Sequence, residues 1–315
     1  MIEFLAYPFM QRALIAALLV GLTAPAIGVF LVQRRQAIMG DGIGHVAMTG
    51  VSLGLLLDWA PVWTAMAVAV LGAVVMELIR SWGRTSGDIA LALLFYGGMA
   101  GGVMLVNLSE DGSTAGLTSY LFGSITTVSP TDVQAVLVLS VLVLALVLGL
   151  RRPLFAVCHD EEFARVSGLP VRLLNLVVAV TAAVTVTVAM RTVGLLLVSA
   201  MMAIPVAAAQ RVARSFALTL GLAMAIGVTV SLTGVVVTYH LDAPSGAAIV
   251  LLAIAVFLVL SATAAPLARR RARAAARRTD GRADAAAPAP RAADGTLSST
   301  DTAGTMAAQH LASSG

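Results

Sequence analysis

Nine long apolar segments, separated by short polar stretches, dominate this sequence of 315 residues. An α-helix needs about 20 apolar residues to cross a bilayer. The segments are too long for strands, and apolar and polar residues do not alternate strictly along them. Lipid offers no hydrogen-bond partners for unpaired backbone N–H and C=O groups, so helices are expected. They lie at residues 9–32, 38–57, 61–79, 89–107, 131–150, 172–190, 192–210, 215–238 and 245–265. The prediction is an all-α, polytopic membrane helix bundle with eight or nine transmembrane helices.

Composition and arginine placement agree with a multi-pass protein of the cell (inner or plasma) membrane. Only 11% of the residues are charged and 59% are hydrophobic, whereas globular domains are roughly 25% charged. Arginines gather in the loops after the first, third, fifth, seventh and ninth segments, so these loops are expected on the cytoplasmic side. The C-terminus is then cytoplasmic and, with nine spans, the N-terminus is outside. If segment six or seven only re-enters the membrane, eight spans remain and the N-terminus changes side.

The chain is expected to divide into a transmembrane permease domain, residues 1–267, and a tail, residues 268–315. The tail is rich in arginine, alanine, proline and serine and has few bulky apolar residues, which predicts a disordered cytoplasmic segment. Its arginine cluster starts at Arg269. A cluster beside a membrane span favours contact with anionic lipids over nucleic-acid binding.

Two residue types limit the chemistry. All 20 basic residues are arginine, and a P-loop requires a lysine. Any ATP-driven process must therefore use an ATPase on another chain, and no enzymatic activity is expected. The single Cys158 excludes an internal disulfide and a cysteine-rich metal site. No permanently bound cofactor is predicted.

Asp41 and His45 lie at the start of the second apolar segment, where ionisable groups are costly. Their i, i+4 spacing places both on one helix face. Carboxylate and imidazole together suit zinc, manganese or iron(II). Alternatively, Asp41 is a helix N-cap and His45 a hydrogen-bonded interior group. Two ligands do not complete a site, but a symmetric dimer would supply four.

The loop at residues 151–171 is the longest polar stretch between spans on the cytoplasmic side. Asp160 is a suitable N-cap and Gly168 a suitable end for a short helix, with Pro170 after it. Such a helix is too short to be stable alone, so it either packs on its own bundle or inserts into a groove of a cytoplasmic partner. The residues assigned to this partner-binding helix are Asp160, Glu161, Glu162, Phe163, Ala164, Arg165, Val166, Ser167 and Gly168.

Other polar or soft side chains have simpler interpretations. The adjacent pair Cys158 and His159 lacks further ligands for a metal. A methionine pair within the seventh segment, at 201–202, is expected to fill the core. Ser129 is expected to cap the fifth segment, ahead of Pro130. His240 and Asp242, near the start of the last segment, favour helix capping over an outer metal contact, and the sequence leaves that choice open.

Six motifs, in order, resemble the permease subunit of the zinc, manganese and iron ABC importer family. RRQAIMGDGIGHVAMTG aligns its arginines, glycine, aspartate and histidine with a family motif. The other five are GDIALALLFYGGMAGG, LFGSITTVSP, DEEFARVSGLP, VGLLLVSAMMAIPVAAAQ and LDAPSGAAIVLLA. The resemblance covers residues 9–266. Gly42 and Gly44 replace larger residues beside the acid and imidazole, and Thr49 stands where proline is common.

The resemblance implies a type II ABC importer permease fold, a homodimeric channel, a cytoplasmic ABC ATPase and an extracytoplasmic metal-binding protein. It places the family's metal ligands on Asp41 and His45, and its ATPase coupling helix on residues 160–168. A rival hypothesis is a gradient-driven secondary transporter or channel that uses the Asp41–His45 pair as a proton relay. The absence of an evident inverted repeat argues against that rival. Asp and His ligands do not distinguish zinc from manganese or iron.

Overall fold

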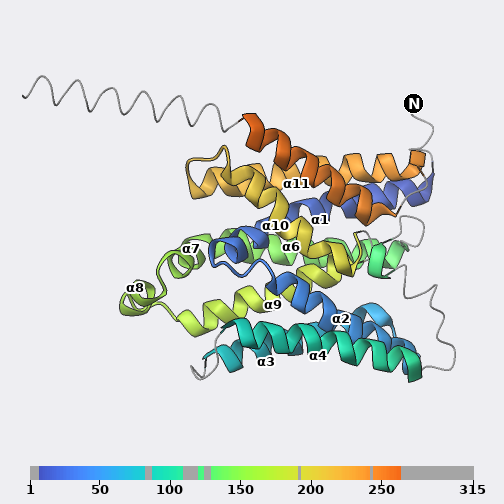
Figure 1. Ribbon diagram of the computed structural model, residues 1–315, viewed down its shortest axis with the longest axis horizontal. Coiled ribbons are helices and arrows are strands. Elements are labelled where there is room, and N and C mark those ends of the chain that lie inside the picture. The colour runs from blue at the N-terminus through green and yellow to red at the C-terminus, as the bar shows by residue number, and fades with distance from the viewer. Residues whose placement is uncertain are drawn as a thin grey trace, which may run out of the picture. The chain divides into compact units, whose positions relative to one another are not determined.

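The computed structural model describes residues 7–81, 87–108, 120–123, 129–190, 193–241 and 244–263. Helices form the regular secondary structure in these ranges, which confirms the predicted all-α class (Figure 1). They are α1 (Pro8–Gln33), α2 (Met39–Leu56), α3 (Pro61–Ser81), α4 (Gly87–Leu108), α6 (Pro130–Gly149), α7 (Arg151–His159), α8 (Glu161–Val166), α9 (Val171–Ala189), α10 (Leu195–Gln210), α11 (Phe216–Leu241) and a last helix, Ser245–Thr263. The predicted tail, residues 268–315, lies outside the described residues.

The predicted count of eight or nine spans is too high when each helix is judged by length and hydropathy. Within the described ranges, seven helices are long and apolar enough to cross a membrane: α1, α3, α4, α6, α9, α11 and Ser245–Thr263. The two that fall short are α2 and α10. α10 has only 16 residues, whereas α2 has 18 but carries an acid, an imidazole and several glycines. The side chains that lower the hydropathy of α2 are those of the candidate site.

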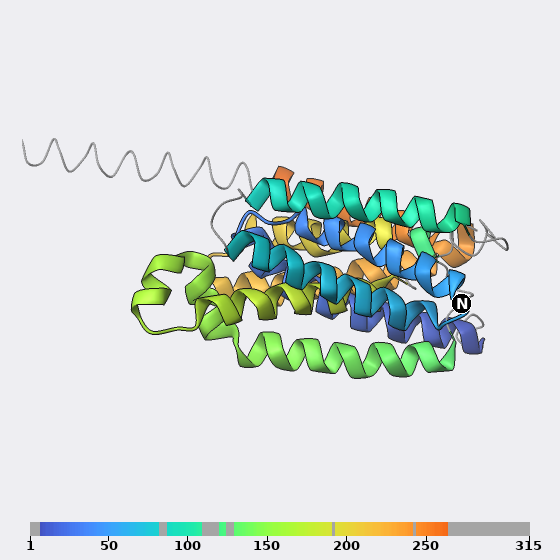
Figure 2. The same ribbon diagram turned by 90° about the horizontal axis from the view of Figure 1, so that it is seen from below.

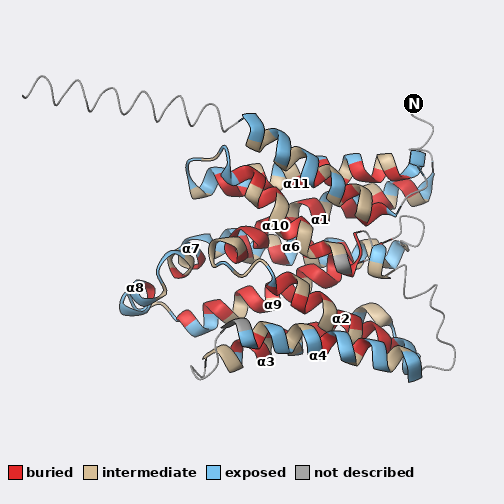
Figure 3. Ribbon diagram, in the orientation of Figure 1, coloured by how far each residue is buried: buried red, intermediate tan, exposed pale blue. Residues whose placement is uncertain are grey.

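The centre of the bundle is formed by α1 and α9. In their most apolar 18-residue windows, 78% and 67% of residues are buried, against 17–39% for the other long apolar helices. α1 packs against α6, α9, α10 and α11, and buried residues follow its length (Figure 3). A helix that is apolar all round is suited to this inner position. The outer helices expose leucine, isoleucine and valine, as expected of a surface that meets lipid or another subunit.

α2 lies between two groups of helices. It packs against α3 and α4, and α10 also contacts it. α10 in turn packs on α1 and α11, so α2 links the α3–α4 pair to the rest of the bundle. A change in the position of α2 therefore affects both groups.

The short helices α7 and α8 project beyond one end of the bundle, opposite the end that holds the start of α1 (Figure 2). The predicted ends of α8 are confirmed. The Asp160 carboxylate accepts a hydrogen bond of 2.9 Å from the backbone N–H of Phe163. Gly168 has a φ of +81°, and the Leu169 N–H bonds to the Ala164 carbonyl at 3.1 Å. This pattern is a Schellman motif, in which glycine relieves the strain of a positive φ.

α7 was not predicted from the sequence, which indicated only one short helix in this loop. It runs on from α6 after a break at Leu150, and Pro153 lies in its first turn, where proline is tolerated. Leu154 and Val157, three residues apart, are buried. This i, i+3 pair was the available signal, but the polar residues around it concealed the pattern.

Candidate functional site

One face of α2 carries the predicted site residues. Asp41, His45 and Thr49 follow one another at i, i+4 spacing and are half-buried, whereas the neighbouring residues 42–44 and 47–48 are buried. We call these three residues the α2 stripe. The stripe lies along the seam where α4 and α10 flank α2, because Asp41 contacts α10 and His45 contacts α4. The structure therefore confirms that Asp41 and His45 share one face of a helix.

Asp41 is not the N-cap of α2. The helix begins at Met39, its N-cap is Ile38, and no side chain caps it. Asp41 instead lies in the first turn, where the helix dipole favours a negative charge. Its Oδ1 accepts a hydrogen bond of 3.4 Å from the Ser199 hydroxyl of α10. Within the described part of the chain this is the one hydrogen bond of the Asp41 side chain, and it leaves most of the carboxylate's acceptor capacity for another partner.

His45 is not the hydrogen-bonded interior group that the alternative interpretation required. Its ring lies edge-on to Phe95 of α4, with the centroids 4.3 Å apart and the planes at 66°. Its Nδ1 is buried and has no hydrogen-bond partner among the described residues. An unsatisfied buried polar atom costs about 1–3 kcal/mol, and in a native protein such an atom calls for an explanation.

Close backbone contact with α4 fixes the position of the stripe. The Thr49 hydroxyl donates a 2.7 Å hydrogen bond to the carbonyl of Gly98. A Cβ on Gly98 would lie 2.6 Å from the backbone nitrogen of Val46 and 2.8 Å from the carbonyl carbon of His45. Only glycine fits there, so Gly98 allows Phe95, one turn earlier, to reach the His45 ring. On the other side, a Cβ on Gly44 would come within 3.1 Å of the Leu195 carbonyl oxygen.

The chain alone offers too few ligands at this place for a closed metal site. Among the described residues, no group of three or more His, Cys, Asp or Glu side chains could hold a metal ion. The α2 stripe supplies one carboxylate and one imidazole, and metal sites commonly use three or four ligands. Metal binding at the stripe would therefore require ligands from outside the described chain.

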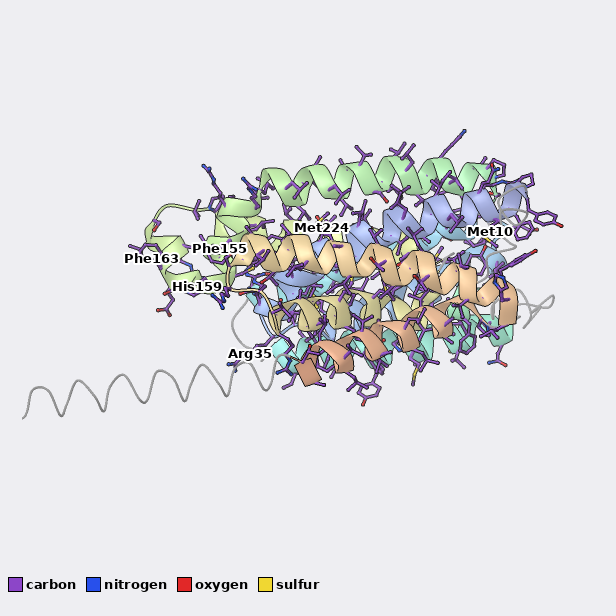
Figure 4. The ribbon with its side chains drawn as sticks, turned by 90° about the horizontal axis from the view of Figure 1, so that it is seen from above. Met10, Arg35, Phe155, His159, Phe163 and Met224 are labelled. Carbon is purple, nitrogen blue, oxygen red and sulfur yellow. The ribbon has the colours of Figure 1, made fainter. Side chains whose placement is uncertain are left out.

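The second candidate region, α8, presents its apolar side chains outward. Phe163 and Val166 are 67% and 88% exposed, whereas Ala164 is fully buried. Figure 4 shows Phe163 at the outer tip of this end, away from the bundle. The short helix thus contacts its own bundle through its inner side, whereas Phe163 and Val166 have no place in that packing. Exposed aromatic and aliphatic side chains on a rigid, capped helix are typical of a docking surface.

The inner side of α8 is tied to the bundle by polar contacts. Glu161 Oε2 lies 4.0 Å from an Nη atom of Arg34 and 3.8 Å from one of Arg80. Its Oε1 accepts a hydrogen bond of 3.4 Å from Asn175 and lies 3.4 Å from Arg165 of the same helix. We call this cluster the Glu161 network. Burial lowers the pKa of Arg34 from its usual value, an effect that nearby acidic groups partly oppose.

The remaining sequence-predicted residues do not gather into a site. His240 bonds through Nδ1 to the Val236 carbonyl of its own helix at 2.9 Å, and Asp242 lies outside the described residues. His159 stacks on Phe155, with ring centroids 5.7 Å apart (Figure 4). The methionines at 201 and 202 are buried in the core, as predicted. Ser129 and Asp132 form a reciprocal capping box at the start of α6, which confirms the predicted cap.

Three neighbours of the α2 stripe were missed from the sequence: Ser199, Phe95 and Gly98. Ser199 and Phe95 lie inside two of the family motifs, but those motifs do not indicate which of their residues approach α2. Their proximity to the stripe depends on how α4 and α10 cross α2. Local spacing carries no signal for that crossing, so the structure was needed to find them.

Comparison with known proteins identifies this kind of bundle. The class of membrane transport subunits is shown by a family model and by similar proteins. The family model described as "ABC 3 transport family" matches residues 6–264. The chain belongs to this family.

Relatives within the family share about a third of their residues with this chain. A manganese transport system membrane protein of Halalkalibacterium halodurans is 31% identical, with 81% of this chain and 87% of the relative covered. A chelated iron transport system membrane protein of Yersinia pestis is also 31% identical, covering 81% and 85%. The solved structure of PsaBC from Streptococcus pneumoniae in complex with Fab superimposes with a TM-score of 0.74 at 30% identity, covering 82% of this chain and 95% of that one. The chain is thus a permease-type subunit of the metal ABC transporters.

Proposed function

We propose that this protein is the membrane subunit of an ATP-driven importer that moves a divalent transition-metal ion into the cytoplasm. The ion is the transported substrate and passes along the α2 stripe, where Asp41 and His45 coordinate it briefly. An extracytoplasmic metal-binding protein delivers it, and a cytoplasmic ABC ATPase supplies the energy. The membership of the chain in a family of metal transport subunits supports this proposal.

The observation that carries the proposal is the incomplete bonding of Asp41 and His45. A structural pair in a membrane helix would be satisfied by its neighbours. Here the carboxylate has one long bond to Ser199, and Nδ1 of His45 has none among the described residues. Oxygen and nitrogen donors of this kind suit manganese(II), iron(II) and zinc(II). A passing cation would give both groups a partner.

A second copy of the chain would complete the site. The α2 stripe is half-buried in the single chain and presents two ligands. Two stripes facing each other across a twofold axis would supply two carboxylates and two imidazoles. Such a set binds an ion well enough to select it, and movement of the two copies would release it. We therefore infer a homodimer with the stripe near its axis.

The α8 end of the bundle is assigned to the cytoplasm, where α8 docks into the partner ATPase. The arginines of this end agree with that orientation, because cytoplasmic loops carry an excess of basic residues. Phe163 and Val166 supply the apolar anchor. The acidic residues Glu161 and Glu162 lie at the start of the helix.

The test is metal uptake by the reconstituted complex of permease and ATPase in proteoliposomes, with the binding protein on the entry side. We expect uptake of labelled manganese(II) that requires ATP hydrolysis. Competition with unlabelled zinc(II) and iron(II) would rank the ions. Uptake that proceeds without ATP and follows an imposed proton gradient would contradict the proposal and favour a secondary transporter.

A further inference from the structure

The Glu161 network joins elements that are far apart in the sequence. Glu161 belongs to α8, Arg34 follows the last residue of α1, and Arg80 lies at the end of α3. Asn175 is in the second turn of α9 and also accepts a hydrogen bond from Arg34. One carboxylate therefore contacts side chains of α3 and α9 and the residue that follows α1.

The network borders an open cavity instead of a packed interface. A cavity of about 700 Å³ is lined by Glu77, Arg80, Ser81, Glu161, Arg165, Pro170, Val171, Arg172, Leu173 and Asn175. These residues come from α3, α8 and the start of α9. The cavity leaves room for α8 to shift relative to α3, since long polar side chains, and not interlocked apolar ones, connect the two helices.

The contacts of Glu161 lead back to the α2 stripe by two short routes. Arg34 is followed by a tight turn at Arg35, which has a φ of +58°, and then by the start of α2 with Asp41. Arg80 lies 3.7 Å from Glu77 of the same helix, and α3 packs along α2. A displacement of Glu161 would therefore pull on both the first turn of α2 and the helix beside it.

We propose that Glu161 is the positioning residue that transmits movement of α8 to the α2 stripe. This inference rests on the proposed function, because it assumes that a partner ATPase moves α8. Movement of Glu161 is passed to the bundle through its contacts with Arg34 and Arg80. Phe163 holds the partner on the outer side of α8, whereas Glu161 holds the bundle on the inner side.

The ion pairs of Glu161 are expected to contribute little to the stability of the fold. The Glu161 side chain is 40% exposed, and its arginine contacts are 3.4–4.0 Å long. The pairs with Arg80 and Arg165, whose side chains are 19% and 65% exposed, contribute about 0–1 kcal/mol each to stability. The Arg34 side chain is only 7% exposed, but it also has a hydrogen bond to Asn175 that does not involve Glu161. Removing one charge should therefore leave the fold intact while weakening the connection. This difference separates transmission from folding in an experiment.

The experiment compares four proteins in the reconstituted complex: wild type, Glu161→Gln, Arg80→Gln and Arg172→Gln. The measured quantities are ATPase retained on the purified permease, ATP hydrolysed and labelled manganese(II) taken up per ATP. Arg172 lines the same cavity, and no contact between it and Glu161 occurs in the described structure, so its replacement is the matched control for Arg80.

For Glu161→Gln and Arg80→Gln we expect unchanged retention of the ATPase and a fall in uptake per ATP of about fivefold or more, the scale of a typical coupling between sites. Arg172→Gln should behave as wild type.

Several results would overturn the inference. Unchanged uptake per ATP in both Glu161→Gln and Arg80→Gln would do so, as would an equal fall in Arg172→Gln. Loss of the ATPase from Glu161→Gln would place that residue in docking instead of transmission. Absence of ATP-dependent uptake in the wild type would instead refute the proposed function, so the two failures are distinguishable.

Discussion

The two polar regions of this protein are built in opposite ways. The α2 stripe lies within the bundle, and its acid and imidazole have almost no hydrogen-bond partners among the described residues. The Glu161 network lies at the α8 end, and its carboxylate has four contacts within the chain. Polar side chains without hydrogen-bond partners, such as that of His45, are available to a ligand. A carboxylate with several weak partners, such as that of Glu161, can connect helices that move relative to one another. Under the proposed function, the first region corresponds to a place of binding and the second to a place of transmission.

The largest expected effect is the loss of a stripe ligand. Asp41→Ala or His45→Ala should lower metal uptake about 100-fold or more. Replacing a residue that only hydrogen-bonds to a metal ligand already lowers metal affinity or activity about 10–100-fold, and loss of the ligand itself should cost more. Purified variants should keep the dimer and the partner ATPase. Normal uptake by both variants would show that the ion does not need the stripe, and the two regions would then not differ in the way described.

A smaller effect is expected at the outer face of α8. Phe163→Asp places a charge on the apolar surface that is 67% exposed in the single chain. A lost anchor of about 2 kcal/mol corresponds to about thirtyfold weaker binding. Binding of the ATPase to the detergent-solubilised permease, measured by titration, should show this change. Equal affinity of the variant and the wild type would mean that α8 does not dock through Phe163.

The next prediction tests the close contact between α2 and α4 that positions the stripe. Gly98→Val should destabilise the α2–α4 contact by about 1–3 kcal/mol, since overpacking displaces backbone. Gly97→Val is the matched control, because a Cβ at Gly97 meets nothing within 4 Å. Thermal unfolding in detergent and manganese(II) uptake should both fall for the first variant and stay near wild type for the second. Similar behaviour of the two would contradict the described crossing of α4 over His45.

The smallest effect concerns the single thiol near the Glu161 network. Burial raises the pKa of the Cys158 thiol to about 11. The reactive thiolate is therefore scarce at neutral pH and increases as the pH rises toward 11. Alkylation by iodoacetamide should be slow at pH 8 and should accelerate in the folded protein only well above pH 9. Rapid alkylation at pH 8 would show that this end of the bundle is more open than described.

Local features of the fold were predictable from the sequence, and long-range ones were not. The ends of α8 followed from Asp160 and Gly168, because caps depend on a few consecutive residues. The cap at Ser129 followed for the same reason. The number of apolar spans exceeded the seven found in the described residues for two reasons. The polar residues and glycines of α2 lower its hydropathy, and α10 has only 16 residues. Helix α7 was missed because only two apolar residues mark its buried face.

The candidate site was predictable in part. Asp41 and His45 stood out because ionisable groups are costly in apolar segments, and their shared face followed from helical spacing. The contacts with Ser199 and Phe95 depend on tertiary packing between helices more than 40 residues apart in sequence. The Glu161 network was missed for the same reason, since Arg34 and Asn175 are 141 positions apart.

The most direct test of the central claim is to observe the substrate ion on the stripe. Manganese(II) bound to the purified permease can be examined by pulsed electron paramagnetic resonance, which detects nitrogen nuclei in contact with the ion. We expect an imidazole nitrogen signal in the wild type that disappears in His45→Ala, with one ion bound per two chains. An identical nitrogen signal in His45→Ala would contradict the account, because the ion would then be bound elsewhere.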